Sequence, residues 1–536
     1  MARVSVLQAA RKQLARGQSA MKLAIRTSRA RETPPVGDAL LACLSGVLMA
    51  LPFLNFRLWL LSWFALVPLL LAIRGKGRRT SFALCYLAGF VFFALVLHWL
   101  FSLVYWVGGV VLAGVILLVA YLAVYWGLFG LLTSFAREKF GARVWFTGAA
   151  IWILLEYVES KLFTGFGWAL VGYTQAYAPG VLQWASVGGV FLVSAIVVLA
   201  NTMIYSVIVE GQRRQLRLAV AVLVFGLIPL GGVLMRAGQT GKTLRVAVIQ
   251  GDFPQDVKWN PDYLADSVFV HERLSSEAAS DGAELIVWSE SAIPASLELN
   301  PRIKEDVERY ADYRDVHLLL GAIRAGQTPE QGHFNSAYLI NADGEIVDWY
   351  DKMHLAPFGE YVPLRRVFPF IGRIMPVLSD LSPGKRRTVF NVRGVKFGTL
   401  ICFETVFPDL VRAMAREDTD FLITITNTAW FGRSAAAFQD LAICVFRAVE
   451  NRMWLVRSAN TGISCFIDPW GAVKSRVGSA EEPVFVRGWS IEDVGAEKRF
   501  SMYRLVGNLF VLLCIVWLTV LGVTGSRRAR KRLWTR

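Results

Sequence analysis

The chain has 536 residues, of which 55% are hydrophobic and 18% charged, and its mean hydropathy is +0.45. This composition excludes an ordinary soluble enzyme, a disordered protein and a small disulfide-rich scaffold, and it indicates that much of the chain lies in lipid. The net charge of +16 is unevenly distributed: residues 238–504 hold 30 Lys+Arg and 35 Asp+Glu, and the rest holds 27 and 6. Because the positive charge accompanies the apolar segments, membrane topology explains it and nucleic-acid binding is disfavoured.

The first 36 residues are basic and contain no apolar core of the kind found in a signal peptide. They predict a cytoplasmic N-terminal extension, with a transit peptide as the alternative. A membrane domain with spans 1–7 is predicted at 37–236, span 8 at 504–526 and a basic cytoplasmic tail at 527–536. The eight candidate spans, a count uncertain by about one, are 39–56, 58–73, 82–101, 107–135, 144–158, 181–209, 218–235 and 505–525.

The basic loops all fall on one side of the membrane when eight spans are assumed. Lys and Arg collect in the N-terminal extension, at 74–79, around 137–143, at 213–217 and in the C-terminal tail. The positive-inside rule makes that side cytoplasmic, so both termini are predicted to be cytoplasmic. The domain at 237–503 then lies outside the cytoplasm, which in a bacterium is the periplasmic side of the inner membrane.

Residues 159–180 form a polar, glycine-rich segment that is dense in aromatic residues. Its composition fits an interfacial loop with Trp and Tyr at headgroup level, and it also fits a lipid-facing loop beside an active site.

Residues 243–504 alternate between short apolar strands and amphipathic helices, which predicts one α/β domain with a mixed sheet. The expected helices are 261–279, 301–314, 408–416 and 435–450. The expected strands are 244–250, 284–290, 316–323, 334–340, 345–350, 395–402, 421–427, 454–459 and 463–467.

Three reactive side chains follow predicted strands of this domain. Glu290 ends an apolar strand, Lys352 opens the loop KMHLAPFGEYVPL, and Cys402 ends VKFGTLI. A carboxylate that accepts a proton, a thiol that attacks a carbonyl and an ammonium that stabilises an oxyanion form a workable acyl-transfer set. On spacing alone this set is only suggestive, because a cysteine that ends a strand is more often a buried core residue and exposed Lys and Glu are usually solvated.

Four motifs, taken in chain order, favour the catalytic interpretation of these residues: WSESAIP, YDKMHLAPFGEYVPL, GTLICFETVFPD and TNTAWFG. They resemble the nitrilase, or carbon-nitrogen hydrolase, superfamily, and within it the family of apolipoprotein N-acyltransferases. The resemblance covers nearly the whole chain. It implies a polytopic α-helical membrane domain of about eight spans plus an α/β nitrilase-like αββα sandwich domain, placed between the seventh and eighth spans.

The resemblance also implies roles for individual residues. It makes Glu290 the general base, Lys352 the oxyanion stabiliser and Cys402 the nucleophile. The supporting acids are Glu360 and Glu404, and the substrate-engaging aromatic residues are Trp259 and Trp430, with Trp168 facing lipid. Because a thioester must be kept from water, the loops around Trp259, Phe358 and Trp430 are expected to shield it. The chain departs from the family pattern at Phe403, Thr428 and Gly167, which puts details of substrate fit in doubt.

The activity implied is N-acylation of the diacylglyceryl-cysteine α-amine of bacterial apolipoproteins. A glycerophospholipid would donate the acyl group through a cysteine thioester, at the lipid bilayer, with no metal or other cofactor and with the protein as a monomer. A membrane-tethered C–N hydrolase with the same three residues is the nearest alternative. A transporter with an appended binding domain is a more distant one, because only Glu156 and His98 are ionisable residues inside the spans.

Overall fold

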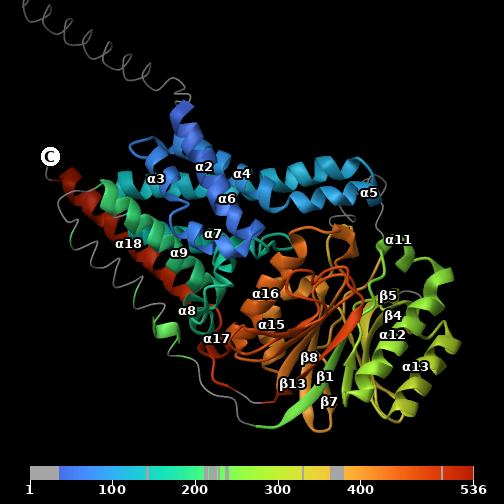
Figure 1. Cartoon of the computed structure of the whole chain (residues 1–536). Helices are drawn as coiled ribbons and strands as arrows, with labels where there is room; N and C mark the ends of the chain where they lie inside the picture. The colour runs from blue at the N-terminus through green and yellow to red at the C-terminus, as the bar shows by residue number, and fades with distance from the viewer. Residues whose placement is uncertain are drawn as a thin grey trace, which may run out of the picture.

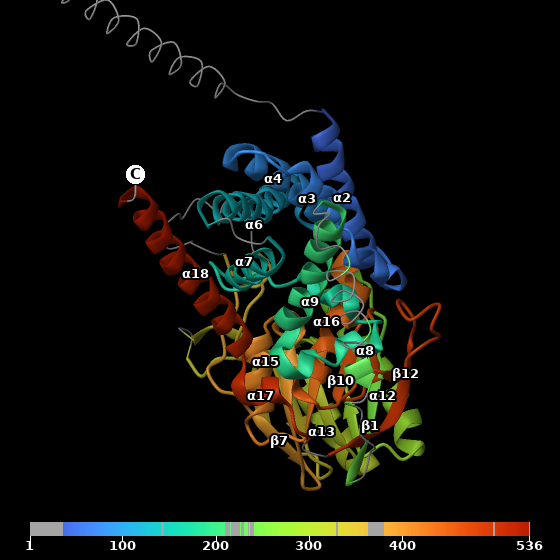
Figure 2. The same cartoon turned by 90° about the vertical axis from the view of Figure 1, so that its left-hand side faces the viewer.

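A computed structural model describes residues 36–140, 144–209, 241–328, 331–362, 380–496 and 499–534, with isolated residues between 215 and 235. Figures 1 and 2 show a group of apolar helices stacked on one side of an α/β domain. The chain passes from the helices into the α/β domain and returns to the helices at its C-terminal end.

Within this part of the chain, four helices are long and apolar enough to cross a membrane. They are α2 (Val36–Leu54), α4 (Arg78–Val96), α6 (Val110–Phe140) and α9 (Ala185–Val209). They correspond to the first, third, fourth and sixth predicted spans, and they establish an apolar helical domain as expected from the hydropathy.

Three other predicted spans correspond to shorter apolar helices. The second is divided between η1 (Phe56–Trp63) and α3 (Val67–Ala72), the fifth is α7 (Val144–Glu159), and the eighth is the apolar part of α18 (Leu509–Trp534). Most of the seventh predicted span and nearly all of the N-terminal extension lie outside the described residues. The number of spans is therefore approximate.

Small residues bring α4 and α6 close together. A Cβ atom added to Gly130 would lie 2.3 Å from the carbonyl oxygen of Ser81, and one added to Gly89 would lie 2.6 Å from Cβ of Trp126. Such close approach is a common way for helices to pack in a membrane, where no hydrophobic effect drives them together.

The α/β domain contains two sheets packed face to face. The first sheet has the order β13-β1-β2-β4-β5-β6, with β3 paired to β4, and the second has the order β12-β11-β10-β9-β8-β7. The strands of the first sheet are β1 (Thr243–Gln250), β2 (Leu285–Val287), β3 (Ile293–Ser296), β4 (His317–Ala325), β5 (His333–Ile340), β6 (Ile346–Asp351) and β13 (Gly488–Gly495). Those of the second are β7 (Val389–Val392), β8 (Val395–Ile401), β9 (Phe421–Thr426), β10 (Leu455–Ala459), β11 (Cys465–Ile467) and β12 (Val473–Arg476).

Helices cover both outer faces, which completes the expected αββα sandwich (Figure 1). The first sheet is covered by α12 (Leu264–Ser280) and α13 (Pro301–Arg314), and the second by α15 (Pro408–Ala415) and α16 (Ala436–Asn451). Strands β3, β7, β12 and β13 were not predicted. The strand expected at 284–290 ends at Val287, so Glu290 lies in the loop that follows β2.

Helix α16 is the boundary between the two parts of the molecule. It packs on β10 and β11 on one side and on α9 and η3 (Val171–Gln175) on the other. As a result every residue of α16 except Phe438 is buried. The α/β domain is therefore fixed to the apolar helices through its own helical layer.

Candidate active site

Cys402 follows β8 directly and begins the short helix η7 (Cys402–Val406). Its φ angle is +53°, a left-handed conformation that a side chain with a Cβ atom rarely adopts. Strand β8 pairs in parallel with β9, and Ile401 lies opposite Ile425. Because of this register, Cys402 and Asn427 lie at the same end of the sheet, where the two parallel strands finish. Asn427 is the second residue after Ile425.

Glu290 reaches that edge from the other sheet. Its Oε2 accepts a hydrogen bond from the backbone N–H of Asn427 (2.7 Å), and its Oε1 accepts one from Nδ2 of Asn335 (2.8 Å). Only 6% of Glu290 is exposed. These bonds hold the carboxylate between the two sheets, beside the residue that follows β8.

Lys352 and Glu360 complete the polar group. Nζ of Lys352 lies 2.9 Å from Oε1 of Glu360 and 3.5 Å from Oε1 of Glu290, and Asn335 Nδ2 also donates to Glu360 (2.9 Å). The second oxygen of Glu360 accepts from the backbone N–H of Ala356 (2.7 Å). Thus one ammonium and one amide hold the two carboxylates in fixed positions.

Glu404 organises the backbone around both Lys352 and Cys402. Its Oε1 accepts from the N–H groups of Met353 (2.7 Å) and His354 (3.0 Å), and its Oε2 accepts from that of Ile401 (2.8 Å). The hydroxyl of Tyr350 donates to the same carboxylate (2.9 Å). One fully buried side chain therefore connects the residues flanking the lysine to the residue preceding the cysteine.

The electrostatics of this group favour a neutral thiol in the resting state. Burial raises the pKa of the Cys402 thiol to about 12; Glu290 raises it further, and Lys352 opposes them. Burial alone would lower the pKa of Lys352, but Glu360 and Glu290 outweigh it and raise that pKa. The lysine is therefore a stable cation, and the thiol needs a base before it can attack.

Aromatic residues of the helical domain pack next to Phe403, the residue that follows Cys402. The Trp168 ring stacks on Phe403 at 6.4 Å between centroids, and its indole N–H donates to Gln439 (2.8 Å). Trp168 is 6% exposed, so the expectation that it faces lipid is wrong. The segment at 159–180 instead folds between the helices and the α/β domain, because its aromatic side chains find partners there. Phe403 has no hydroxyl group, and its ring instead stacks on that of Trp168.

The other predicted aromatic residues are partly or largely exposed. The Trp430 carbonyl accepts from the indole N–H of Trp106 (3.2 Å), and the two rings meet edge to face. Trp259 and Phe358 are 42% and 45% exposed. Their exposed rings can contact a ligand, whereas the ring of a buried core residue cannot.

Several polar residues at the site were not found from the sequence. Asn335 bridges the carboxylates of Glu290 and Glu360, and the backbone N–H of Asn427 holds that of Glu290. The sequence around Asn335 does not distinguish it from an ordinary polar residue, and Asn427 lies in the TNTAWFG motif without a role of its own. Lys258 is 5% exposed and donates to the carbonyl oxygen of Glu290 (2.8 Å). Burial lowers its pKa to about 7, against the opposing influence of Glu290 and Cys402. The only available signal was its position directly before Trp259.

Comparisons with known proteins agree with this architecture. A family model described as the apolipoprotein N-acyltransferase N-terminal domain matches residues 45–203, and one described as carbon-nitrogen hydrolase matches residues 245–499. The apolipoprotein N-acyltransferase of Geobacter metallireducens is 34% identical over 92% of this chain and 96% of its own length. The chain belongs to the apolipoprotein N-acyltransferase family.

Another relative has the same family name. The apolipoprotein N-acyltransferase of Haemophilus influenzae is 29% identical over 88% of this chain and 91% of its own length. A solved structure of a mutant amidase from Nesterenkonia AN1, of the nitrilase superfamily, is 19% identical and covers 48% of this chain and 92% of its own, with a TM-score of 0.38.

Proposed function

We propose that this membrane acyltransferase moves an acyl chain from a glycerophospholipid to the α-amine of a diacylglyceryl-modified apolipoprotein, through a thioester on Cys402. The observation that carries the proposal is the combination of Cys402, Glu290 and Lys352 next to an aromatic contact, Trp168 on Phe403, between the helical domain and the α/β domain. A site next to the membrane helices is suited to substrates that remain in the bilayer.

In the first half-reaction Glu290 takes the thiol proton while the Cys402 sulfur attacks the ester carbonyl of the phospholipid. The negative charge that develops on the carbonyl oxygen is stabilised by Lys352. The ester C–O bond then breaks, Glu290 returns the proton to the leaving oxygen, and a lysophospholipid departs. The acyl group remains on sulfur.

In the second half-reaction the α-amine of the acceptor attacks the thioester. Glu290 accepts the proton that the nitrogen loses, the C–S bond breaks, and the proton passes to the Cys402 thiolate. The product is an amide and the enzyme is restored. Holding both lipids at one bilayer surface supplies proximity, and the loops around Trp259, Phe358 and Trp430 limit access of water to the thioester.

The topology belongs to the same proposal. We place the domain at 237–503 on the periplasmic side of a bacterial inner membrane, with residues 37–236 and 504–526 in the bilayer. The extension at 1–36 and the tail at 527–536 are then cytoplasmic, and a monomer contains the whole site.

The proposal is tested by the intact mass of the purified protein after incubation with phospholipid. We expect an increase equal to one fatty-acyl group, absent in Cys402→Ala and removed by a diacylglyceryl-cysteine peptide. An adduct that only water removes would favour a C–N hydrolase. If the folded protein gains no mass with any phospholipid, the proposed donor is wrong.

A further inference from the structure

Lys258 is a buried lysine beside the candidate active site to which the mechanism above gives no role. It ends the short helix α11 (Gln255–Lys258), directly before Trp259, and is 5% exposed. Its Nζ donates a hydrogen bond to the backbone carbonyl oxygen of Glu290 (2.8 Å) and forms no ion pair with a carboxylate among the described residues. A cation taken out of water without a counter-ion is unfavourable, so an apolar side chain of the same length would be more stable here.

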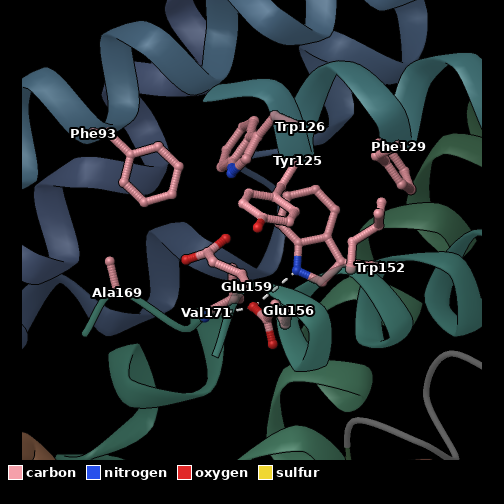
Figure 3. Close-up of a pocket in the computed structure, with 10 residues that line it drawn as sticks. Phe93, Tyr125, Trp126, Phe129, Trp152, Glu156, Glu159, Ala169 and Val171 are labelled. Carbon is pink, nitrogen blue, oxygen red and sulfur yellow. Dashed lines mark hydrogen bonds between the residues drawn. The ribbon is translucent and has the colours of Figure 1, made fainter. Parts of the chain in front are cut away.

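Buried ionisable side chains also lie in the helical domain, and they show by contrast what is particular to Lys258. Glu156 and Glu159 on α7 line a cavity of about 20 Å³ together with aromatic residues of α4, α6 and α7 (Figure 3). Glu156 accepts hydrogen bonds from the indole N–H of Trp152 (2.9 Å) and the backbone N–H of Val171 (2.8 Å), which both belong to the helical domain. Lys258 is instead hydrogen-bonded to the residue proposed as the general base.

The carbonyl group that Lys258 binds belongs to a backbone segment in an unusual conformation. It is part of the peptide between Glu290 and Ser291, and the φ angle of Ser291 is +48°, in the left-handed region. The segment also lies directly against β4: a Cβ atom added to Gly321 would be 2.6 Å from the carbonyl oxygen of Ser289 and 2.7 Å from the backbone nitrogen of Ser291. Such a conformation persists only where surrounding contacts hold it, and the Lys258 hydrogen bond is one of them.

Helix α11 is connected to Glu290 a second time, through its first residue. Oε1 of Gln255, which is buried, accepts from Nδ2 of Asn427 (3.0 Å), and the backbone N–H of Asn427 donates to Oε2 of Glu290 (2.7 Å). One end of α11 therefore holds the main chain of Glu290 directly, and the other end holds its carboxylate through Asn427.

From these contacts we propose that Lys258 is a positioning residue for acyl transfer, which fixes the main chain of Glu290 so that its carboxylate stays between the two sheets beside Cys402. The inference rests on the proposed function, in which Glu290 is the base. Lys258 acts on the reaction through Glu290 and makes no contact with the acyl group.

The strength of this hold depends on the charge of Lys258. An ammonium donates a stronger hydrogen bond than a neutral amine. Burial lowers the pKa of Lys258 to about 7, against the opposing influence of Glu290 and Cys402, so the side chain is a cation at pH 6 and an amine at pH 8. The remaining titratable neighbour, His271 on α12, is uncharged at both pH values, because burial lowers its pKa to about 4.

The test compares Lys258→Met with the wild-type protein in single-turnover acylation by phospholipid, followed by intact mass. Met keeps the length of the side chain and removes the charge and the donor. At pH 6 the maximal acylation rate is expected to fall about tenfold, while the half-saturating phospholipid concentration changes less than about twofold. Between pH 6 and pH 8 the wild-type rate is expected to fall about threefold more than that of Lys258→Met. Glu404, whose pKa burial raises to about 7, titrates in both proteins and cancels in this comparison.

Two controls distinguish a positioning role from a structural one. Lys258→Met removes a buried cation, so its thermal unfolding midpoint at pH 7 is expected to equal or exceed that of the wild type. Lys304→Met, at an exposed position on α13, keeps the wild-type rate at both pH values. The inference is overturned if Lys258→Met is acylated as fast as the wild type at pH 6, or if the ratio of the two rates is the same at pH 8 as at pH 6. A wild-type protein that gains no acyl group would instead refute the proposed function, and this inference with it.

Discussion

Individual residues at the candidate site are held by contacts that a single substitution can remove. Glu404 is the clearest case, because one carboxylate accepts from Met353, His354 and Ile401 as well as from Tyr350. In Glu404→Gln an amide NH₂ faces at least one of these donors. A buried donor left unpaired costs about 1–3 kcal/mol.

We therefore expect Glu404→Gln to be less stable by about 2 kcal/mol and slower in forming the acyl-enzyme by at least tenfold. The loss arises because the backbone on either side of Lys352 and Cys402 is no longer fixed. Single-turnover kinetics and thermal unfolding measure the two effects. Glu417→Gln, which removes an exposed partner of Arg387, is the matched control. Full activity in Glu404→Gln would contradict the interpretation.

A second residue-scale prediction concerns His271, which stacks between Phe253 and Trp288 and is 1% exposed. Burial lowers its pKa to about 4, whereas an unfolded histidine titrates near 6.5. Between these values the unfolded state binds a proton that the folded state does not. Stability from this group is therefore complete above pH 6.5 and decreases as the pH falls toward 4.

In His271→Phe the ring stack is kept and the titration is lost. Between pH 7 and pH 5 the wild-type protein is expected to lose about 2 kcal/mol more stability than His271→Phe. Chemical unfolding at the two pH values, followed by near-UV circular dichroism, measures the difference. Equal losses in the two proteins would mean that His271 does not titrate as its burial implies.

That Glu290, Lys352 and Cys402 lie together could be predicted from the sequence, and the residues that hold them could not. Glu290, Lys352 and Cys402 lie in long motifs next to strands, and the structure brings them to one edge between the sheets. Asn335 and Asn427 reach the same carboxylate from β5 and from the loop after β9, contacts that depend on how two sheets face each other. No local pattern encodes that geometry. Lys258 was missed for the same reason.

At the scale of elements, Gln439 on α16 joins the α/β domain to the membrane helices. Its Oε1 accepts from the indole N–H groups of Trp99 (3.0 Å) and Trp168 (2.8 Å), and its Nε2 donates to the carbonyls of Phe53 (3.3 Å) and Val96 (3.1 Å). Those carbonyls lie in the last turns of α2 and α4, where helices leave acceptors unpaired. One side chain thus provides hydrogen-bond partners for four buried polar groups.

Gln439→Leu leaves all four groups unpaired, so we expect a loss of stability of several kcal/mol, at about 1–3 kcal/mol for each group. Transfer from phospholipid is expected to fall more than hydrolysis of a short water-soluble thioester, because Trp168 loses its position while the α/β domain stays folded. Thermal unfolding and the ratio of the two activities measure this. Phe438→Leu, at the exposed neighbouring position, is the control; a Gln439→Leu protein with an unchanged ratio would contradict the argument.

Elements with strong periodicity were predicted well, and short edge strands were not. Strand β1, helix α13 and helix α16 match their expected positions within about one residue. Strands β7, β12 and β13 were missed because they are short or largely polar, and they form only by pairing with β8, β11 and β1. For β13 that pairing is antiparallel to β1 across a sequence separation of more than 200 residues, which a local pattern cannot reveal.

At the scale of the whole molecule, the predicted membrane topology rests on charge and hydropathy. The basic segments flank the apolar helices, whereas residues 238–504 have more acidic than basic side chains. Because positive loops stay on the cytoplasmic side, the α/β domain should lie opposite the C-terminal tail. The return of α18 to contact α7 and α9 is consistent with a chain that crosses once more after this domain.

A protease experiment tests this arrangement with an epitope placed after Arg536. In spheroplasts trypsin is expected to cleave within 238–504 and to leave the epitope attached to a C-terminal fragment protected by the bilayer. In inverted membrane vesicles the epitope should be removed while the α/β domain stays intact. A cytoplasmic protein, degraded only after lysis, confirms that the spheroplasts are sealed. The opposite pattern would place the domain in the cytoplasm and remove its access to lipoproteins on the outer face.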